Sequence, residues 1–266
     1  MVRVSVVLTV YNGEKYIADA LESLRAQTYP DFETVVVDDG STDRTAGIVR
    51  PYTNDRVRLL SPGRLGYPRV LNHGIAAAQG EYIAILDADD IALPTLLERE
   101  VDLLDAHPEI GLVGAGHRQL RQDGSGQDYP CAEEDAELRR TLLFGIPFGH
   151  SGAMYRRACF DRVGGYDESL ACCGDPDLFL RMAAHCRLGG VRDILWIRRL
   201  TGDNYFTTRF RGWNLVRTSL GIRFRHLRGI CPAPAWWFYW IAPVLLPRPV
   251  RRWLRRSFWR DERPRW

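Results

Sequence analysis

The segment Tyr82-Ile83-Ala84-Ile85-Leu86-Asp87-Ala88-Asp89-Asp90 passes from an apolar run directly into three carboxylates. Such an apolar run is typical of a strand that is buried on both faces, as in a parallel sheet. The carboxylates then lie at the carboxyl edge of the sheet, where open α/β sheets bind ligands. Their negative charges repel one another unless a cation or hydrogen-bond donors offset them. A divalent metal ion bound by the carboxylate oxygens would offset the repulsion. The alternative is a solvated acidic turn that caps a helix starting near Pro94.

Strand-like and helix-like segments alternate on both sides of this segment. Alternation at this spacing predicts βαβ units and a parallel sheet, so we expect an α/β fold. The predicted strands are 2–10, 32–37, 57–60, 82–86 and 110–114, and the predicted helices are 14–27, a short one that ends at 49, 70–78 and 94–106. Farther along, the pattern predicts a polar connector at 118–134, helices at 135–144 and 175–186, and strands at 151–156 and 191–197.

The charge of the chain is divided unevenly between its two parts. Residues 1–197 carry 20 Lys+Arg against 30 Asp+Glu, whereas residues 198–266 carry 16 Arg against 3 acids. Such a division indicates an acidic body and a basic tail that meets an anionic surface. We therefore expect a catalytic or binding domain at 1–200 and an Arg- and Trp-rich helical tail at 201–266.

The tail combines tryptophan, arginine and one apolar run. Residues 235–246 are apolar but include Pro243, and they are shorter than the roughly 20 residues that span a bilayer. Tryptophan prefers the membrane–water interface, and five arginines between 248 and 256 suit anionic lipid headgroups. We expect the tail to bind a membrane surface rather than nucleic acid; a helical hairpin packed on the body or on a partner is the alternative.

Cysteine and lysine usage excludes several other classes. The six cysteines have no CxxC spacing, and no signal peptide precedes the first strand, so reduced thiols in a cytoplasmic protein are expected. Lys15 is the single lysine, which excludes a Walker A phosphate loop. The cysteine usage and the predicted membrane-binding tail together predict a cytoplasmic protein at the inner face of the cell membrane.

Two predicted strand ends carry acids, and a third carries Thr9 and Tyr11. If these strands are neighbours, the groups line one crevice at the carboxyl edge of the sheet. There Asp39 can accept a hydrogen bond from a nucleotide base, Tyr11 can stack on the base, and Asp89 can hold a metal on a diphosphate. The sequence therefore predicts a nucleoside diphosphate bound through a metal, without a glycine-rich loop.

Several motifs resemble, in order, those of the family 2 glycosyltransferases. The first is VSVVLTVYNGEKYIADALESLRAQTYPDFETVVVDDGSTDRT at residues 4–45. The resemblance covers about residues 2–200 and implies a GT-A fold, a Rossmann-like and mostly parallel sheet flanked by helices, with inversion at the sugar carbon. The later motifs are Gly66, NHGI at 72–75, GEY at 80–82, DAD at 87–89, GHS at 149–151, MYRR at 154–157, GGYD at 164–167 and DPDLFLR at 175–181.

The resemblance also implies roles for individual residues. Thr9, Tyr11, Asp39 and Asp87 would bind the sugar nucleotide, commonly a UDP-sugar, and Asp89 would ligate Mn²⁺ or Mg²⁺. Asp175 would be the catalytic base that deprotonates the hydroxyl of a glycan or lipid-linked acceptor. His150 and Asp177 are expected to contact the acceptor or a phosphate.

The sequence departs from the family pattern at one point. Gly174 stands where the family has glutamate before the base. This puts the contacts of that glutamate to the acceptor in doubt. It also supports an alternative, a catalytically silent subunit that binds sugar nucleotides or polysaccharide.

Two other enzyme classes fit less well. A haloacid-dehalogenase-type phosphatase needs Thr or Val where Ile91 stands, and a lysine later in the chain. A dinucleotide-binding oxidoreductase needs a third glycine where Gln119 stands. A metal-dependent glycosyltransferase is therefore the predicted function.

Overall fold

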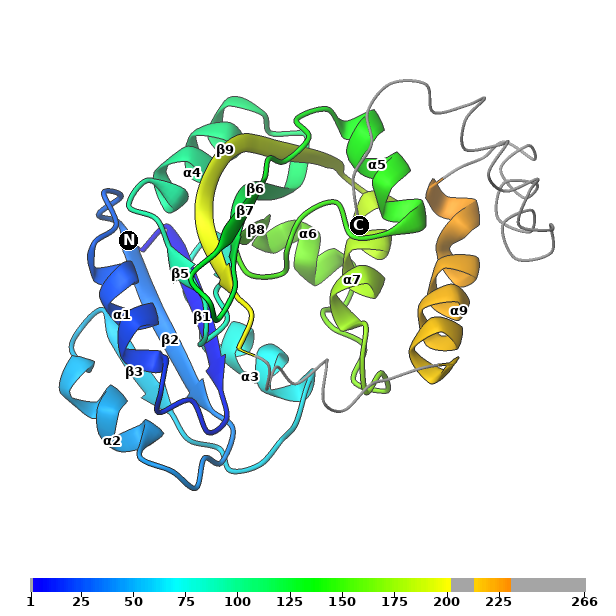
Figure 1. Ribbon diagram of the computed structural model, residues 1–266. Helices are drawn as coiled ribbons and strands as arrows, with labels where there is room; N and C mark the ends of the chain where they lie inside the picture. The colour runs from blue at the N-terminus through cyan, green and yellow to red at the C-terminus, as the bar shows by residue number, and fades with distance from the viewer. Residues whose placement is uncertain (1, 202–212, 231–266) are drawn as a thin grey trace. The chain divides into compact units, whose positions relative to one another are not determined.

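The computed structural model describes residues 2–201 and 213–230 (Figure 1). The predicted membrane-binding segment at 235–256 lies outside the described residues. The strands are β1 Val4–Val10, β2 Phe32–Asp38, β3 Val57–Leu60, β4 Tyr82–Ile85, β5 Ile91–Ala92, β6 Ile110–Leu120, β7 Gly126–Tyr129, β8 Ala153–Arg156 and β9 Arg187–Arg199. The α-helices are α1 Ile17–Arg25, α2 Thr45–Val49, α3 Arg69–Ala77, α4 Leu96–Ala106, α5 Asp135–Phe144, α6 Arg157–Arg162, α7 Gly174–Ala183 and α9 Trp213–Ile230.

One sheet organises the described part of the chain, in the order β3-β2-β1-β4-β8-β6-β9-β5. Its first four strands are parallel, as the alternation of strands and helices predicts. The other half is mixed, because β8 lies antiparallel between β4 and β6, and β5 is antiparallel to β9. The sheet is mostly parallel, as expected from the sequence, because β6 and β9 also pair in parallel and run in the same direction as the first four strands. Strand periodicity predicts burial but does not predict which strands are neighbours.

The parallel half is buried on both faces. On β1 the side chains of Val4, Val6 and Leu8 belong to a core cluster that α1 and α4 also enter. The opposite face meets α3, where a Cβ at Gly74 would lie 2.7 Å from the side chain of Val7. A larger residue at 74 would push α3 away from the sheet, so glycine here permits the close approach. The apolar run of β1 thus reflects two covered faces.

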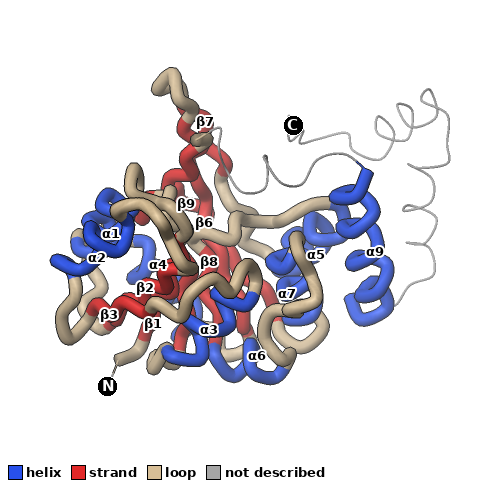
Figure 2. Tube along the Cα trace, turned by 90° about the horizontal axis from the view of Figure 1, so that it is seen from below, coloured by secondary structure: helices blue, strands red, loops and turns tan. Residues whose placement is uncertain are grey.

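The polar connector predicted at 118–134 contains an additional hairpin. β6 continues to Leu120 and pairs with β7, which Arg118 supports through an ion pair with Asp128 at 2.6 Å. Figure 2 shows this hairpin extending away from the rest of the sheet. Because β7 is largely exposed and polar, it lacks the alternating apolar pattern that identifies a strand in sequence.

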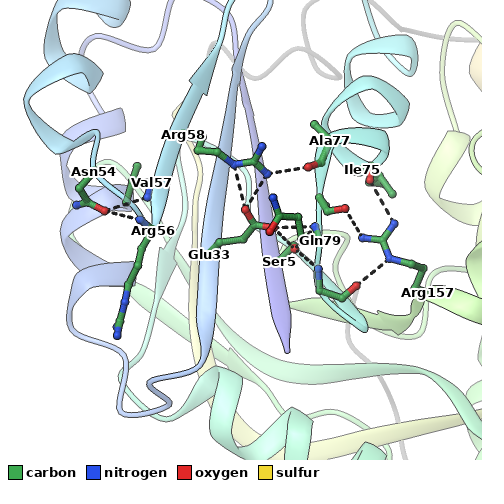
Figure 3. Close-up of polar contacts among 12 residues, drawn as sticks. Ser5, Glu33, Asn54, Arg56, Val57, Arg58, Ile75, Ala77, Gln79 and Arg157 are labelled. Atoms are coloured by element: carbon green, nitrogen blue, oxygen red, sulfur yellow. Dashed lines mark hydrogen bonds and ion pairs between the residues drawn. The ribbon is translucent and has the colours of Figure 1, made fainter. Parts of the chain in front are cut away.

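A buried polar network fixes the point where the chain enters β4 (Figure 3). Glu33 on β2 accepts hydrogen bonds from Ser5, Arg58 and the backbone of Gln79, each at 2.7 Å. Arg157 donates to two carbonyl groups at and beyond the end of α3, each at 2.8 Å. Arginine at this place satisfies carbonyl groups that a helix end leaves without partners. The network joins β1, β2 and α3, and so sets the start of β4, the strand that leads to Asp87.

Residues 1–227 form one compact unit, and residues 228–266 form a second. Within the first unit, α9 contacts the protein through Arg223, which donates to the backbone carbonyls of Leu142 and Gly145. The division predicted at residue 200, between a catalytic domain and a membrane-binding tail, remains a prediction.

The α4 helix carries an acid inside the core. Glu100 is fully buried, and neither of its carboxylate oxygens has a hydrogen-bond partner among the described residues. Burial raises the pKa of Glu100 well above its usual 4.5. The folded protein therefore holds this proton at a pH where the unfolded chain releases it, so stability falls as pH rises above the pKa of the unfolded chain.

We expect Glu100→Gln to remove this pH-dependent loss of stability. At pH 8 the variant should exceed the wild-type free energy of unfolding by about 1 kcal/mol or more, and the difference should shrink toward pH 4. Urea unfolding across this pH range measures it. Asp102→Asn, at an exposed position of the same helix, is the matched control. Equal pH dependence in wild type and Glu100→Gln would contradict the expectation.

Candidate active site

The tips of β1 and β2 hold two residues of the predicted nucleotide site. Tyr11 is 47% exposed after β1, and Asp39 is buried after β2. The guanidinium of Arg64 stacks 3.5 Å from the centroid of the Tyr11 ring and forms an ion pair with Asp39 at 2.7 Å. Asp39 also accepts hydrogen bonds from the backbone of Leu65 and Gly66, at 2.6 and 3.0 Å. This side of the site therefore has an aromatic face next to a carboxylate that fixes the loop after β3.

The turn after β1 is held against the turn after β2. Asn12 has a left-handed backbone, with φ 51°, and its side chain accepts a hydrogen bond from the backbone of Thr42 at 2.8 Å. The backbone of Gly13 donates to Thr45 at 2.8 Å. Thr9 lies at the end of β1 next to Val37 of β2. These contacts keep Thr9, Tyr11 and Asp39 at neighbouring strand ends, as predicted.

The acidic segment after β4 lies beside the same turn. A Cβ on Gly13 would be 3.9 Å from the Cβ of Ala88. Burial raises the pKa of Asp89 to about 6, and the charge of Asp87 adds to the shift. Asp90 is buried and accepts a hydrogen bond from the backbone of Arg199 at 3.0 Å, which ties the segment to β9. The segment that carries Asp87 and Asp89 thus adjoins the turn after β1, and Asp90 ties this segment to β9.

The antiparallel strand β8 brings His150 to Asp87. β8 begins opposite the end of β4, with Ala153 paired to Ile85, so the residues just before it meet those just after β4. The backbone of Asp87 donates to Ser151 at 3.0 Å, and Nδ1 of His150 lies 3.7 Å from Oδ1 of Asp87. Sequence motifs alone do not predict this contact, because it depends on the mixed half of the sheet.

His150 also begins a chain of hydroxyl contacts. Its Nε2 lies 2.6 Å from the hydroxyl of Tyr166, which is 2.5 Å from the hydroxyl of Tyr155. Burial lowers the pKa of His150, but the hydrogen bond and charge of Asp87, together with the charge of Asp175, leave the pKa above 6.5. The two tyrosines orient the imidazole, and Asp87 favours its protonated form.

Asp175 lies in the first turn of α7, almost completely buried. It is 8% exposed, and its Oδ1 has no hydrogen-bond partner among the residues that the structure describes. Burial raises the pKa of Asp175, while the charge of His150 opposes the shift. Phe148, just before the histidine, packs on Phe179 of α7 with ring centroids 5.2 Å apart, which holds the helix to this loop. Asp87, His150 and Asp175 thus act on one another electrostatically.

The helix α7 begins with unusual backbone geometry. Cys173, which precedes it, has φ 62°. With Asn12, it is one of two non-glycine residues with positive φ among those described, and each is next to or near a predicted site residue. Left-handed backbone at such residues costs about 1–3 kcal/mol and is frequent at functional sites.

Asp177 faces a different set of groups from Asp175. It is 1% exposed, and its two oxygens are engaged by Arg181 at 2.8 Å and by His226 of α9 at 3.0 Å. These contacts fasten α9 to α7. The predicted contact of Asp177 with an acceptor or phosphate remains a prediction.

The acids of this site suit a hard cation. No group of three or more His, Cys, Asp or Glu side chains that could hold a metal occurs among the described residues. Mg²⁺ and similar ions are nevertheless commonly held by one or two carboxylates, with substrate phosphates and water completing the coordination. Asp89 and Asp87 offer such oxygens, and burial together with the charge of Asp87 raises the pKa of Asp89. The donor set therefore fits a divalent ion that arrives with a diphosphate.

Tyr67 and Tyr166 complete the site beyond the residues predicted for it. Tyr67 follows Gly66 in an irregular loop, and its phenol reaches Gly174. Tyr166 belongs to the GGYD motif at residues 164–167, from which no role for the tyrosine follows. Tyr67 contacts Gly174, about 100 positions away in the sequence, and Tyr166 contacts His150, 16 positions away. The periodicity of apolar residues does not predict contacts at these separations.

A family model described as glycosyl transferase family 2 matches residues 5–164. The chain is also 30% identical over 228 residues to EpsE of Bacillus subtilis (strain 168), whose name calls it a glycosyltransferase; the match covers 83% of this chain and 73% of EpsE. The chain belongs to glycosyl transferase family 2. It spans 20–59% of the length of the next three curated relatives.

Solved structures of glycosyltransferases share the fold. S. aureus TarS 1–349, in complex with UDP-GlcNAc, superposes with a TM-score of 0.72 at 23% identity, over 85% of this chain and 66% of TarS. The mannosyltransferase PcManGT from Pyrobaculum calidifontis, in complex with GDP-Man and Mn²⁺, gives a TM-score of 0.61 at 22% identity, over 94% of this chain and 82% of its own. The GT-A fold expected from the motifs is therefore confirmed. Within the described residues, each helix is too short or too polar to cross a bilayer.

Proposed function

We propose that the protein is an inverting glycosyltransferase that moves a sugar from a nucleotide-sugar donor to a hydroxyl of a glycan or lipid-linked acceptor. The observation that carries the proposal is the buried Asp175 carboxylate at the start of α7, with one oxygen unpartnered among the described residues and with Asp87 within electrostatic reach. A base beside the acids of a diphosphate site is what a single displacement requires.

The donor is assigned to the edge formed by β1, β2 and β4. Tyr11 offers an exposed aromatic face on which the nucleobase can stack. The carboxylate of Asp39 can accept a hydrogen bond from an N–H of the nucleobase if Arg64, which now stacks on Tyr11 and pairs with Asp39, moves aside or keeps only part of its contact with Asp39. Thr9 and Asp87 line the same edge. A UDP-sugar is the proposed donor class, since TarS was solved with UDP-GlcNAc; PcManGT was solved with GDP-Man, so the donor screen includes both UDP- and GDP-sugars.

The reaction is proposed as one displacement at the anomeric carbon. Asp175 removes the proton of the acceptor hydroxyl while that oxygen forms its bond to the carbon. The bond from carbon to the diphosphate oxygen breaks, and the nucleoside diphosphate leaves with the electron pair. Burial raises the pKa of Asp175, which makes its ionised form a stronger base. Its place in the first turn of a helix favours the ionised form.

A metal is proposed as part of the donor complex. Mn²⁺ or Mg²⁺ held by Asp89 supplies positive charge to the diphosphate when it is bound. His150, whose pKa lies above 6.5 beside Asp87, is proposed to add positive charge near the same phosphates or the acceptor.

We expect Asp175→Asn to lower kcat for sugar transfer by at least about 10³-fold, because the amide cannot accept the proton, while the Kd for the nucleoside diphosphate changes little.

We expect Asp89→Ala to weaken metal-dependent binding of the nucleoside diphosphate, because the proposed metal ligand is removed. A donor screen by nucleotide release, followed by calorimetry with UDP and Mn²⁺, measures both.

Asp90→Asn is the matched control for Asp89, since it is the neighbouring acid and it accepts a hydrogen bond from the backbone of Arg199. Normal turnover in Asp175→Asn would refute its role as the base. Wild-type protein that binds nucleotide and metal but transfers sugar from no donor would instead support the silent binding subunit, for which Gly174 is the argument.

The tail is proposed to bind an anionic membrane surface at the cytoplasmic side, where a lipid-linked acceptor would be reached. The argument is compositional: Arg251, Arg252, Arg255 and Arg256 follow a Trp-rich apolar segment. We expect their replacement by glutamine to reduce co-sedimentation with phosphatidylserine-containing vesicles by about tenfold or more. Replacing four exposed arginines of the body is the control, and equal binding by both variants would refute the proposal.

A further inference from the structure

The first residue of α7 is glycine for reasons of space. Gly174 does not belong to the glycines with positive φ, so its backbone accommodates any L-amino acid. A Cβ at this position would lie 2.7 Å from the hydroxyl oxygen of Tyr67 and 3.2 Å from its Cε1 and Cζ atoms. The phenol of Tyr67 therefore occupies the space that a side chain at 174 would enter.

Tyr67 also contacts the backbone of the residue proposed as the base. Its hydroxyl accepts a hydrogen bond from the backbone N–H of Asp175. That N–H belongs to the first turn of α7, where a helix leaves its donors without intrahelical partners. Burial, and the negative charges of Asp175 and Asp87, raise the pKa of Tyr67 well above 10, so the phenol is neutral at physiological pH.

The loop that carries Tyr67 is fixed from the nucleotide side. Asp39 accepts hydrogen bonds from the backbone of Leu65 and Gly66, and it forms an ion pair with Arg64. On the other side of Tyr67, Pro68 is followed directly by α3, which packs on β1 and β2. The hydroxyl of Tyr67 is thus presented to α7 from a segment with anchors on both sides.

We propose that Tyr67 is a positioning residue for Asp175: its ring fills the space next to Gly174, and its hydroxyl fixes the first turn of α7 so that the carboxylate meets the acceptor. The inference rests on the proposed function, because it takes Asp175 as the base. It accounts for the departure at 174, since a glutamate side chain and the phenol of Tyr67 would require the same space. Gly174 and Tyr67 then form one unit, in which a neutral hydroxyl replaces a carboxylate beside the base.

The test is a double-mutant cycle in the full-length protein. Tyr67→Phe keeps the ring but removes the hydroxyl; we expect about a tenfold loss of kcat, with donor KM within about twofold of wild type. Gly174→Ala should lower kcat by about tenfold or more, because its Cβ meets the Tyr67 hydroxyl. In the Tyr67→Phe background the closest atoms lie at 3.2 Å, so Gly174→Ala should cost less than about threefold there.

Gly47→Ala on α2 is the matched control, since a Cβ there meets nothing within 4 Å and the backbone is not left-handed. It should leave kcat and the melting temperature unchanged or slightly higher. A melting temperature and a UDP Kd for each variant separate a shift of the base from unfolding.

Each outcome decides the matter. Wild-type kcat in Tyr67→Phe, or additive losses in the double variant while the wild type is active, would overturn the role of Tyr67 and leave the proposed function intact. Normal turnover in Asp175→Asn would refute the base, and the role of Tyr67 would fall with it. A non-additive effect of Tyr67→Phe and Gly174→Ala on kcat, together with an unchanged kcat in Gly47→Ala, supports the proposal.

Discussion

The burial of one carboxylate at the start of α7 is the constraint on which the site depends. An ionisable group with an unpartnered oxygen, nearly removed from water, costs about 1–3 kcal/mol or more in folding free energy, and Asp175 is in that position. The left-handed backbone of Cys173 just before it adds strain. Both are tolerated because other contacts hold α7 in place: it packs on α5 and β6, Phe148 packs on Phe179, and Asp177 binds His226 of α9. A carboxylate held in this way has its basicity raised before any substrate arrives.

The site is assembled by contacts between segments that follow different strands. Hydrogen bonds between side chains and backbone join the turn after β1 to the turn after β2. The acidic segment after β4 packs on the turn after β1. The segment before β8 meets Asp87 through Ser151 and His150. The loop after β3 reaches both Asp39 and the first turn of α7. Charged groups from distant positions in the sequence thus lie within electrostatic reach of one another.

The sequence allowed the parallel half of the fold and the acids at its edge to be predicted, because apolar strands that end in carboxylates are local patterns. The helix at 135–144 and the strand at 57–60 were predicted with their observed bounds. Three strands of the other half were also predicted near their observed positions, at 110–114, 151–156 and 191–197. The antiparallel insertion of β8 between β4 and β6 was not predicted, since this pairing depends on residues about 70 and 40 positions apart. The exposed hairpin partner β7 carries no apolar periodicity. For the same reason, the partners of His150 and the contact of Tyr67 with Gly174 had no signal in the sequence, although the departure at 174 marked the place.

The configuration of the transferred sugar tests the central claim most directly. With a donor found by nucleotide release, the proton NMR spectrum of the product gives the anomeric configuration of the new glycosidic linkage, which does not mutarotate. A single displacement assisted by one base, Asp175, predicts a product linkage of opposite configuration to that of the donor. A product that retains the configuration of the donor would contradict the account, because retention requires a second displacement or a front-face mechanism that this arrangement of Asp175 does not provide.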